Sequence, residues 1–431
     1  MKTIIYNAQI KQPNQWINNG CIQIEDGFIL AISSQTPDEK LISSFDQVID
    51  AKGMALLPGL VNGHTHFSQT FMRGLAGGRP LLQWLKELIW PLQAEISVQE
   101  MQLAALLGLA ENVRCGVTEV VNHHKITRSR QHTLAVKEAA EKIGIRTTIA
   151  RAWANKGKIN ETDQQIMEEL EEWYTVFHSD ALTKFASGPL TPWRCSAELL
   201  QKTHQLSLNH NSFTHIHVSE TAEEVQMTVE ETGMRPVHWL DQIGVLDDHT
   251  QVVHAVWVDD SEIELLAKKK ATVVHCPVSN AVLGSGVAPV RKMLNQDVNL
   301  RLGTDGPASN DTQDCFENMK MALCLARATF LDANNLSNQH VLDMAVNHQT
   351  LSIGAKADLI LVKMNNLHSA PVHDLDSALT LCSRGDDVDT VMVEGKIVLQ
   401  NGKLTTIDEE VLLKECNLAI NSLRKRAGIS I

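Results

Sequence analysis

From about residue 54 to residue 308, short β-rich apolar runs alternate with longer stretches whose apolar residues recur every three or four positions. The short runs are typical of buried strands, and the longer stretches are typical of amphipathic helices. Eight such runs occur, at residues 55–62, 117–122, 146–152, 184–188, 213–218, 251–256, 271–276 and 298–303. The alternation predicts an α/β fold with a closed (β/α)8 barrel of the TIM type. A doubly wound open sheet is the alternative, but such a sheet does not need eight units.

Both ends of the chain carry additional strand patterns. These patterns lie at residues 3–10, 21–24, 28–32, 358–363, 388–393 and 396–399. Residues 409–425 have the pattern of an amphipathic helix. We therefore expect a small β-sandwich domain whose two halves are residues 1–55 and 355–431, the second half including the C-terminal helix. The barrel, residues 56–354, is inserted between these halves.

Composition excludes several classes of partner. The net charge of −13 argues against binding of DNA, RNA or an anionic membrane surface. The first residues lack the apolar segment and cleavage site of a signal peptide, and no stretch is apolar for the length of a membrane span. The eight cysteines form no Cys-x-x-Cys pair, so we interpret them as reduced thiols in a cytoplasmic protein. No glycine-rich phosphate loop opens the first predicted helix.

Candidate chemistry gathers where the predicted strands end, which is the face on which barrels of this kind carry their sites. The residues are His64 and His66 after the first strand, His217 and Glu220 after the fifth, His254 on the sixth, and Asp305 after the eighth. A single histidine in such a position is more often a hydrogen-bonded core residue than a ligand. Six groups of this kind at one end of a barrel instead indicate a metal-dependent active site.

Three histidines and one aspartate can hold a divalent metal and leave one position open for water, whose pKa then falls to roughly 7. His254 suits the role of a base and proton shuttle for that water. Glu220 suits an acid that protonates the substrate, and Asp305 can both bind the metal and accept the water proton. Catalytic roles are therefore expected for Glu220, His254 and Asp305.

The order of these motifs resembles that of the amidohydrolase superfamily, in its branch of triazine hydrolases, guanine-type deaminases and adenosylhomocysteine deaminases. The motifs are PGLVNGHTH at 58–66, HVSE at 217–220, HA at 254–255, SNAVLGSGVAP at 279–289 and GTDG at 303–306. The resemblance implies that His64, His66, His217 and Asp305 bind the metal and that Glu220 and His254 transfer protons.

Metal number follows from the same resemblance. Superfamily members with two metals usually carry a bridging lysine at the end of the fourth strand, whereas the only lysine of residues 184–190 is Lys184, at the other end. We expect one divalent ion per chain, zinc as the first choice and iron as the alternative. Barrels of this superfamily are often dimers, so a homodimer is one expected assembly.

Substrate contacts are expected from the loops that follow the strands. Gln69 offers a donor and an acceptor to the edge of a ring, and Trp84 offers a flat apolar face, although helix packing would also explain Trp84. His123, which ends the second strand, and Asn280 are further candidates, with a supporting position as the alternative for His123. Leu82 occupies the position where adenosine-type deaminases usually carry an acid that holds the ribose hydroxyls. This predicts a free base rather than a nucleoside.

The expected function is metal-dependent hydrolytic deamination of a small nitrogen heteroaromatic ring of the oxopurine, pterin or triazine type. Ammonia would be released after attack by metal-bound hydroxide. One alternative is a deaminase of adenosine, methylthioadenosine or adenosylhomocysteine, and another is a hydrolase that removes chloride or an alkylamine from a triazine. Hydrolysis of a cyclic amide is disfavoured by the missing bridging lysine. A metal-binding paralogue without activity would have lost part of the constellation, and all six residues are present.

Overall fold

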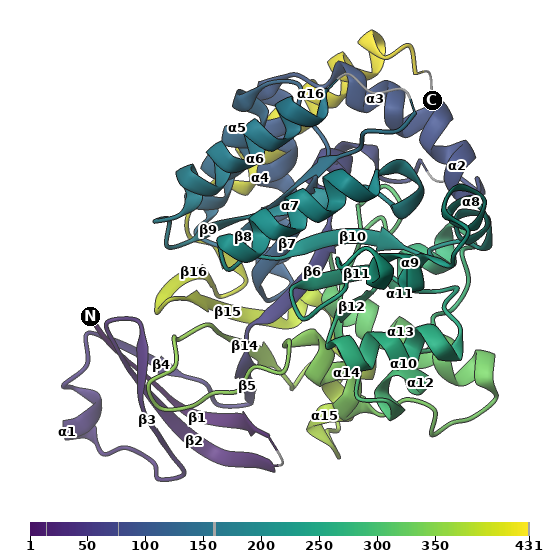
Figure 1. Ribbon diagram of the computed structural model, residues 1–431. Coiled ribbons are helices and arrows are strands. Elements are labelled where there is room, and N and C mark those ends of the chain that lie inside the picture. The colour runs from purple at the N-terminus through teal and green to yellow at the C-terminus, as the bar shows by residue number, and fades with distance from the viewer. Residues whose placement is uncertain (14, 76, 158–160, 430–431) are drawn as a thin grey trace.

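Within residues 1–13, 15–75, 77–157 and 161–429, which the computed structural model describes, eight parallel strands follow one another around a nearly closed barrel (Figure 1). They are β6 (Leu60–Thr65), β7 (Val117–His124), β8 (Arg146–Trp153), β9 (Thr183–Pro189), β10 (Thr214–Val218), β11 (Thr250–His254), β12 (Thr272–His275) and β13 (Asn299–Leu302). The backbone N–H of Asp305, just beyond β13, donates to the carbonyl of His64 at 2.8 Å and joins the last strand to the first. The predicted (β/α)8 architecture is confirmed.

Helices cover the outside of the barrel (Figure 1). Those between consecutive strands, or directly after the last strand, are α4 (Val98–Arg114), α5 (Arg130–Ile143), α6 (Asp163–Phe177), α7 (Ala197–Asn209), α8 (Ala222–Thr232), α9 (Pro236–Gln242), α10 (Asp260–Lys269), α11 (Pro277–Val282), α12 (Val290–Asn295) and α13 (Cys315–Phe330). Local sequence fixes where they begin. Ser97 accepts a hydrogen bond from the N–H of Glu100, whose carboxylate accepts one from the N–H of Ser97, and this capping box starts α4.

A long connection between β6 and β7 lies over the site end of the barrel. It contains η1 (Phe67–Met72), α2 (Leu81–Trp84), η2 (Leu85–Ile89) and α3 (Trp90–Glu95). Short turns and helices elsewhere are α1 (Glu39–Ile42), η3 (Pro192–Arg194), α14 (Asn338–Ala345), α15 (Leu375–Ser377), η4 (Ala378–Cys382) and η5 (Gly385–Asp387). The predicted C-terminal helix is present as α16 (Glu409–Arg426), which lies beside α4 and α3 (Figure 1).

The second sheet is mixed and takes strands from both ends of the chain, as the sequence predicts. In the described residues its members are β1 (Lys2–Gln12), β2 (Gln15–Glu25), β3 (Phe28–Ser33), β4 (Gln47–Asp50), β5 (Met54–Pro58), β14 (Leu359–Lys363), β15 (Val388–Val393), β16 (Lys396–Gln400) and β17 (Lys403–Leu404). The two ends meet where β14 pairs antiparallel with β5.

The structure divides the run predicted as the first barrel strand, residues 55–62, into two strands. β5 belongs to the second sheet and β6 to the barrel, and Gly59 lies between them. Glycine is required at this point because a Cβ on Gly59 would lie 2.0 Å from the Oγ1 of Thr118. The hydrophobic pattern does not mark the break, since the apolar residues on both sides are fully buried.

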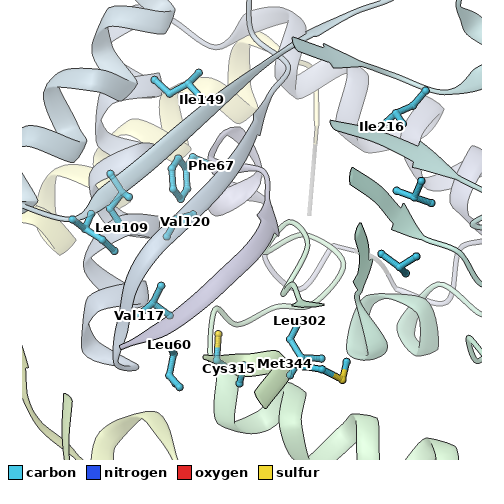
Figure 2. Packing of buried hydrophobic residues seen from close by; sticks show 14 of the residues in the cluster. Leu60, Phe67, Leu109, Val117, Val120, Ile149, Ile216, Leu302, Cys315 and Met344 are labelled. Carbon is cyan, nitrogen blue, oxygen red and sulfur yellow. The ribbon is translucent and has the colours of Figure 1, made fainter. Parts of the chain in front are cut away.

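One apolar cluster joins the strands to the surrounding helices (Figure 2). Leu60 on β6 and Leu302 on β13 contribute from neighbouring strands, while Leu109 on α4 and Met344 on α14 contribute from helices. Because such interiors are close-packed, the strand ends are held in fixed relative positions. This rigidity positions the candidate site.

A buried polar network closes the barrel between β6 and β13. The Nδ2 of Asn62 donates to the Oγ1 of Thr304 at 2.8 Å and to the Oδ1 of Asn112 at 3.0 Å, and its Oδ1 accepts from the N–H of Thr304 at 3.0 Å. All three residues are fully buried. The side chain of Asn62 therefore adds to the backbone hydrogen bond between Asp305 and His64 in closing the ring of strands.

We predict that Asn62→Ala lowers the free energy of unfolding by roughly 2–4 kcal/mol, because buried groups of Thr304 and Asn112 lose their partner. Urea denaturation measures this change. The control is Asn421→Ala on the exposed face of α16, which should change the free energy of unfolding by less than about 0.5 kcal/mol. Equal stability of both variants would contradict the prediction.

Candidate active site

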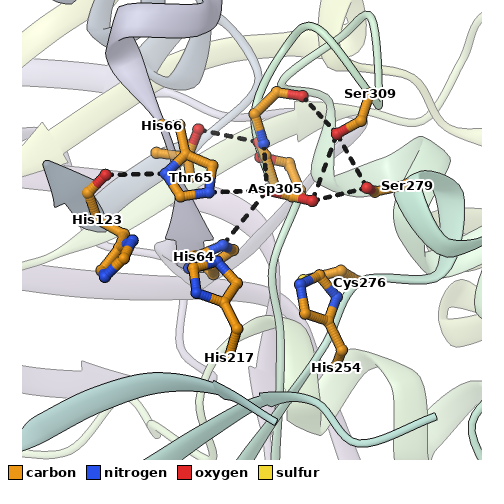
Figure 3. A network of polar contacts seen from close by, with 12 residues as sticks. His64, Thr65, His66, His123, His217, His254, Cys276, Ser279, Asp305 and Ser309 are labelled. Atoms are coloured by element: carbon orange, nitrogen blue, oxygen red, sulfur yellow. Dashed lines mark hydrogen bonds and ion pairs between the residues drawn. The ribbon is translucent and has the colours of Figure 1, made fainter. Parts of the chain in front are cut away.

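The strand ends bring the candidate ligands to one point, as Figure 3 shows. His64 lies in β6 and His66 directly follows it, His217 lies in β10 and His254 in β11, and Asp305 follows β13. All five side chains are buried. Ligand-type atoms lie within 4.8 Å of one another in two overlapping groups, which are His64, His66 and His217, and His64, His254 and Asp305.

Hydrogen bonds on the outer side of two rings determine which nitrogen faces this point. The Nδ1 of His66 lies 2.8 Å from the carbonyl oxygen of His123, and the Nδ1 of His217 lies 3.0 Å from that of Leu190. A carbonyl only accepts, so both Nδ1 atoms carry the proton. The Nε2 atoms of His66 and His217 are therefore left with a lone pair, which is the form that binds metals.

The tautomer of His64 follows from a relay of two further side chains. The Nδ1 of His215 donates to the Oε1 of Gln251 at 2.9 Å, so the Nε2 of His215 is an acceptor. The Nδ1 of His64 lies 2.8 Å from that Nε2 and donates to it. The Nε2 of His64 is buried and has no hydrogen-bond partner in the described part of the chain. It therefore presents a lone pair as well.

Asp305 completes the set. Its Oδ1 lies 3.3 Å from the Nε2 of His64 and 3.2 Å from that of His66, while its Oδ2 accepts a hydrogen bond from the Oγ of Ser279 at 2.6 Å (Figure 3). Burial acts to raise the pKa of Asp305, but its close interactions with the rings of His64 and His66 hold that pKa well below its ordinary value.

These groups fit a divalent cation. Lone pairs of three neutral imidazoles and one carboxylate oxygen converge in a buried space, where they would repel one another unless a positive charge lay between them. Burial lowers the pKa of His64, His66 and His217, which keeps the three rings neutral at physiological pH. His64, His66, His217 and Asp305 are therefore the residues that would hold the ion.

Glu220 and His254 lie next to this set. The Nδ1 of His254 donates to the Oδ1 of Asn280 at 3.0 Å, and the Nε2 of His254 lies 3.4 Å from the Oε2 of Glu220. Burial, together with the negative charge of Asp305, raises the pKa of Glu220 to about 8. A carboxylic acid in this state is protonated at neutral pH and can donate a proton.

The loops enclose a cavity of about 100 Å³ above these residues. Gln69 and Trp84 line it, as do Leu82 and Leu85. The Oε1 of Gln69 and the Nε1 of Trp84 are buried without a hydrogen-bond partner in the described residues, so both can bind a ligand.

His123 and Asn280 are outside the lining of this cavity in the described residues. The Nε2 of His123 donates to the carbonyl of Gly188 at 2.9 Å, and the backbone carbonyl of His123 accepts from His66. Asn280 accepts from His254. In this structure both residues support groups of the site, and their assignment to substrate contact stays a prediction.

Four residues that sequence reasoning left out also line the cavity, namely Lys125, Trp193, Arg194 and Glu224. Lys125 directly follows β7, Trp193 and Arg194 follow β9, and Glu224 lies in the first turn of α8. Only Lys125 directly follows a strand, and this position was the one signal that the sequence offered. Burial and the charge of Glu220 raise the pKa of Glu224 to about 7.

Comparison with known proteins agrees with this geometry. A family model described as "Amidohydrolase family" matches residues 55–398. The 5-methylthioadenosine/S-adenosylhomocysteine deaminase of Pyrococcus furiosus is 35% identical over 423 residues, which are 95% of this chain and 98% of the relative. The 5'-deoxyadenosine deaminase of Methanothermobacter thermautotrophicus is 34% identical over 420 residues, 94% of this chain and 95% of the relative.

Among solved structures, an adenosine deaminase from Xanthomonas campestris with bound zinc superposes with a TM-score of 0.91 and 27% identity. The superposition covers 98% of both chains. In the described part of this chain, no helix combines the length and the apolar character that crossing a membrane requires. Since the family model matches most of the chain and relatives above 30% identity align over nearly its full length, the protein belongs to the amidohydrolase family and is a hydrolase that acts on C–N bonds.

Proposed function

We propose that the protein is a metal-dependent hydrolytic deaminase of an adenosine-type nucleoside. The proposal is carried by the similarity to relatives that are more than 30% identical over nearly the whole chain. These relatives are named as deaminases of methylthioadenosine, adenosylhomocysteine and deoxyadenosine. These comparisons favour the nucleoside alternative over the free ring that Leu82 predicts.

The cavities support a substrate with two parts. The cavity of about 100 Å³ shares Trp90, Lys125, Leu190 and Arg194 with an adjoining cavity of about 730 Å³. A ring in the inner cavity can therefore carry a substituent that extends into the outer one. Leu82 lines only the inner cavity, so a ribose in the outer cavity need not meet Leu82.

For the metal, we propose one divalent ion held by His64, His66, His217 and Asp305, with zinc as the first choice and iron as the alternative. When bound, such an ion supplies Lewis acidity that makes water nucleophilic at neutral pH.

The protein residues then have separate tasks. The Nε2 of His254 and the carboxylate of Asp305 accept the proton of the attacking water. Glu220, whose pKa is raised to about 8, donates a proton to the ring nitrogen next to the amine-bearing carbon. The carbon gains the water oxygen, and the proton held by His254 and Asp305 passes to the amine. The C–N bond then breaks, the amine leaves as ammonia, and the remaining hydroxyl proton returns to Glu220 as the carbonyl forms. Gln69 and Trp84 orient the ring.

The purified protein is expected to contain about one divalent ion per chain, and His66→Ala is expected to lose it, because one of four ligands is removed. Elemental analysis measures the content, and His178→Ala, at an exposed histidine, serves as the control. His215→Ala should keep all four ligands but bind the ion about 10–100-fold more weakly, since His64 loses its acceptor. Two ions per active chain would contradict the single-metal proposal.

Glu220→Gln is expected to retain the metal and to lose about 10²–10⁴-fold in kcat, because glutamine has the same shape but its amide is not acidic enough to transfer a proton. The pH profile provides a second check. The acid is protonated below its raised pKa of about 8, so the kcat/KM of the wild type should fall as the pH rises through that value. If Glu220→Gln had the kcat of the wild type, Glu220 would not be the proton donor of the reaction.

Substrate choice is tested by ammonia release from matched panels. Adenosine, 5'-deoxyadenosine and 5'-methylthioadenosine form the first panel, and guanine, isoxanthopterin and an aminotriazine form the second. We expect kcat/KM for the best nucleoside to exceed that for the best free ring by at least about 100-fold, because the outer cavity binds the nucleoside alone. A clear preference for a free ring would overturn the nucleoside proposal and restore the significance of Leu82.

A further inference from the structure

A glutamine that follows the proposed ligand Asp305 in sequence is fully buried behind the metal site. Gln313 lies between β13 and α13, and none of its side chain is exposed. A buried amide is unfavourable unless its donors and acceptors have partners. The partners of Gln313 therefore show which parts of the structure it holds together.

All four hydrogen-bonding positions of this amide are filled. The Oε1 of Gln313 accepts from the Oγ1 of Thr65 at 2.7 Å and from the Nδ2 of Asn112 at 3.0 Å. The Nε2 of Gln313 donates to the carbonyl of Asp305 at 3.2 Å and to that of Thr312 at 3.1 Å. Because a carbonyl only accepts, the Nε2 must face these two oxygens, and the orientation of the amide is fixed.

Two of these partners belong to the segments that carry three of the four proposed ligands. Thr65 lies between His64 and His66, and its side chain points to the opposite face because side chains alternate along a strand. The Oγ1 of Thr65 also lies 3.0 Å from the carbonyl oxygen of Asp305. Thr65, Gln313 and the backbone of Asp305 thus form a closed triangle of hydrogen bonds behind the ligands.

Gln313 acts on the ligands without touching the reacting groups. In the described part of the chain, neither Gln313 nor Thr65 lines the inner cavity. Both side chains are fully buried on the far side of β6. Any effect of Gln313 on the site therefore passes through the ligand segments themselves.

Helix α4 holds Gln313 in place from outside the barrel. The backbone N–H of Gln313 donates to the Oε1 of Glu111 at 3.1 Å, and the carboxylate of Glu111 forms an ion pair with Arg73. Asn112, the next residue of the helix, also donates to the carbonyl of Gly108 at 2.8 Å. The amide is thus attached to a long helix as well as to the two strand ends that it joins.

The strand ends need such a support because their ligand atoms repel one another. The Oδ1 of Asp305 lies 3.3 Å from the Nε2 of His64 and 3.2 Å from that of His66. Unless a cation lies between them, the negative carboxylate and the two lone pairs act to separate the ends of β6 and β13. A support that keeps these ends together beforehand reduces the free-energy cost of ordering them when an ion binds.

We propose that Gln313 is a positioning residue of the metal site, which holds His64 and His66 at the distance from Asp305 that one divalent ion requires. The proposal rests on the proposed function, because it concerns the ion that this function requires. Since Gln313 contacts the ligand segments and not the cavity, it sets the affinity for the ion rather than the choice of substrate. Groups that orient metal ligands typically contribute about 10–100-fold to that affinity.

Three variants test this role. Gln313→Met replaces the amide with an apolar side chain of similar length and removes all four hydrogen bonds. Thr65→Val keeps the branched shape of the side chain and removes only the hydroxyl. Ser207→Ala is the control, because Ser207 is buried on α7, outside the barrel, where its Oγ forms a hydrogen bond of 2.8 Å with the hydroxyl of Tyr174.

Each protein is freed of metal and titrated with Zn²⁺ against a competing chelator, which measures Kd. Gln313→Met should raise the Kd for Zn²⁺ by about 10–100-fold and Thr65→Val by about 10-fold. Ser207→Ala should lower the free energy of unfolding but change this Kd by less than about threefold. Because both site variants break the same support, the Kd of the double variant should stay within about threefold of that of Gln313→Met.

The visible absorption of the Co²⁺-loaded proteins gives a second measurement, because its intensity and band positions depend on the arrangement of the ligands. Gln313→Met and Thr65→Val should change the spectrum, whereas Ser207→Ala should keep that of the wild type. If Gln313→Met has the Kd and the spectrum of the wild type, or changes no more than Ser207→Ala does, the positioning role is overturned. If Gln313→Met does not fold, Thr65→Val decides the question by the same criteria.

These measurements do not depend on turnover, so they separate this proposal from the proposed function. If the wild type binds Zn²⁺ but deaminates no nucleoside, the proposed function fails, and the Kd values of the variants still decide the role of Gln313. If the wild type deaminates a nucleoside and both site variants have its Kd, the proposed function stands and the positioning role fails. A wild type that binds no divalent ion would overturn both.

Discussion

The site depends on hydrogen bonds made on the side of the histidine rings that faces away from it. His66 and His217 each donate an Nδ1 proton to a backbone carbonyl, and His64 donates to His215. These bonds turn the lone pairs of three Nε2 atoms toward one buried point, and the low pKa of the rings keeps them neutral. A bound cation would stabilise these converging lone pairs. The barrel matters because it fixes the carbonyls of β7 and of the loop after β9 relative to β6 and β10. Four side chains are the candidate ligands, and the tautomers of the three histidines among them are set by two backbone carbonyls and by the side chain of His215.

Two carboxyl groups in the same pocket have opposite properties, and their surroundings explain the difference. Asp305 interacts with two histidines and with Ser279, so it remains ionised. Glu220 is equally buried but lies near the negative charge of Asp305, and its pKa rises to about 8. One residue is therefore suited to binding a metal and taking up a proton, and the other is suited to giving a proton away. Pairs of titratable groups whose pKa values are shifted in opposite directions are typical of hydrolytic active sites.

Strand periodicity and strand ends were sufficient to predict the barrel and the set of residues that converges at its mouth, because His64, His217, His254 and Asp305 each lie where a parallel strand stops. The same information could not reveal Lys125, Arg194 or Glu224, since a charged residue just after a strand faces the solvent as often as the site. The raised pKa of Glu220 could not be predicted from the sequence either, because it depends on burial by loops that are distant in sequence. Leu82 lines the inner cavity, as expected of a loop that faces the substrate, but no sequence pattern describes the outer cavity beside it. The break at Gly59 was missed because Leu57 and Leu60 are equally buried on its two sides.

That break also links the ends of the chain to the chemistry. β5 is held between β1 and β14, which come from opposite ends of the sequence, and only Gly59 separates β5 from the strand that carries His64 and His66. The second sheet therefore acts as an anchor that sets how far β6 extends into the barrel. Side chains alternate along a strand, so a slip of one residue at this anchor would turn both imidazoles away from the other ligands. Shortening either terminus would thus disturb the alignment of the ligands before it disturbed the barrel itself.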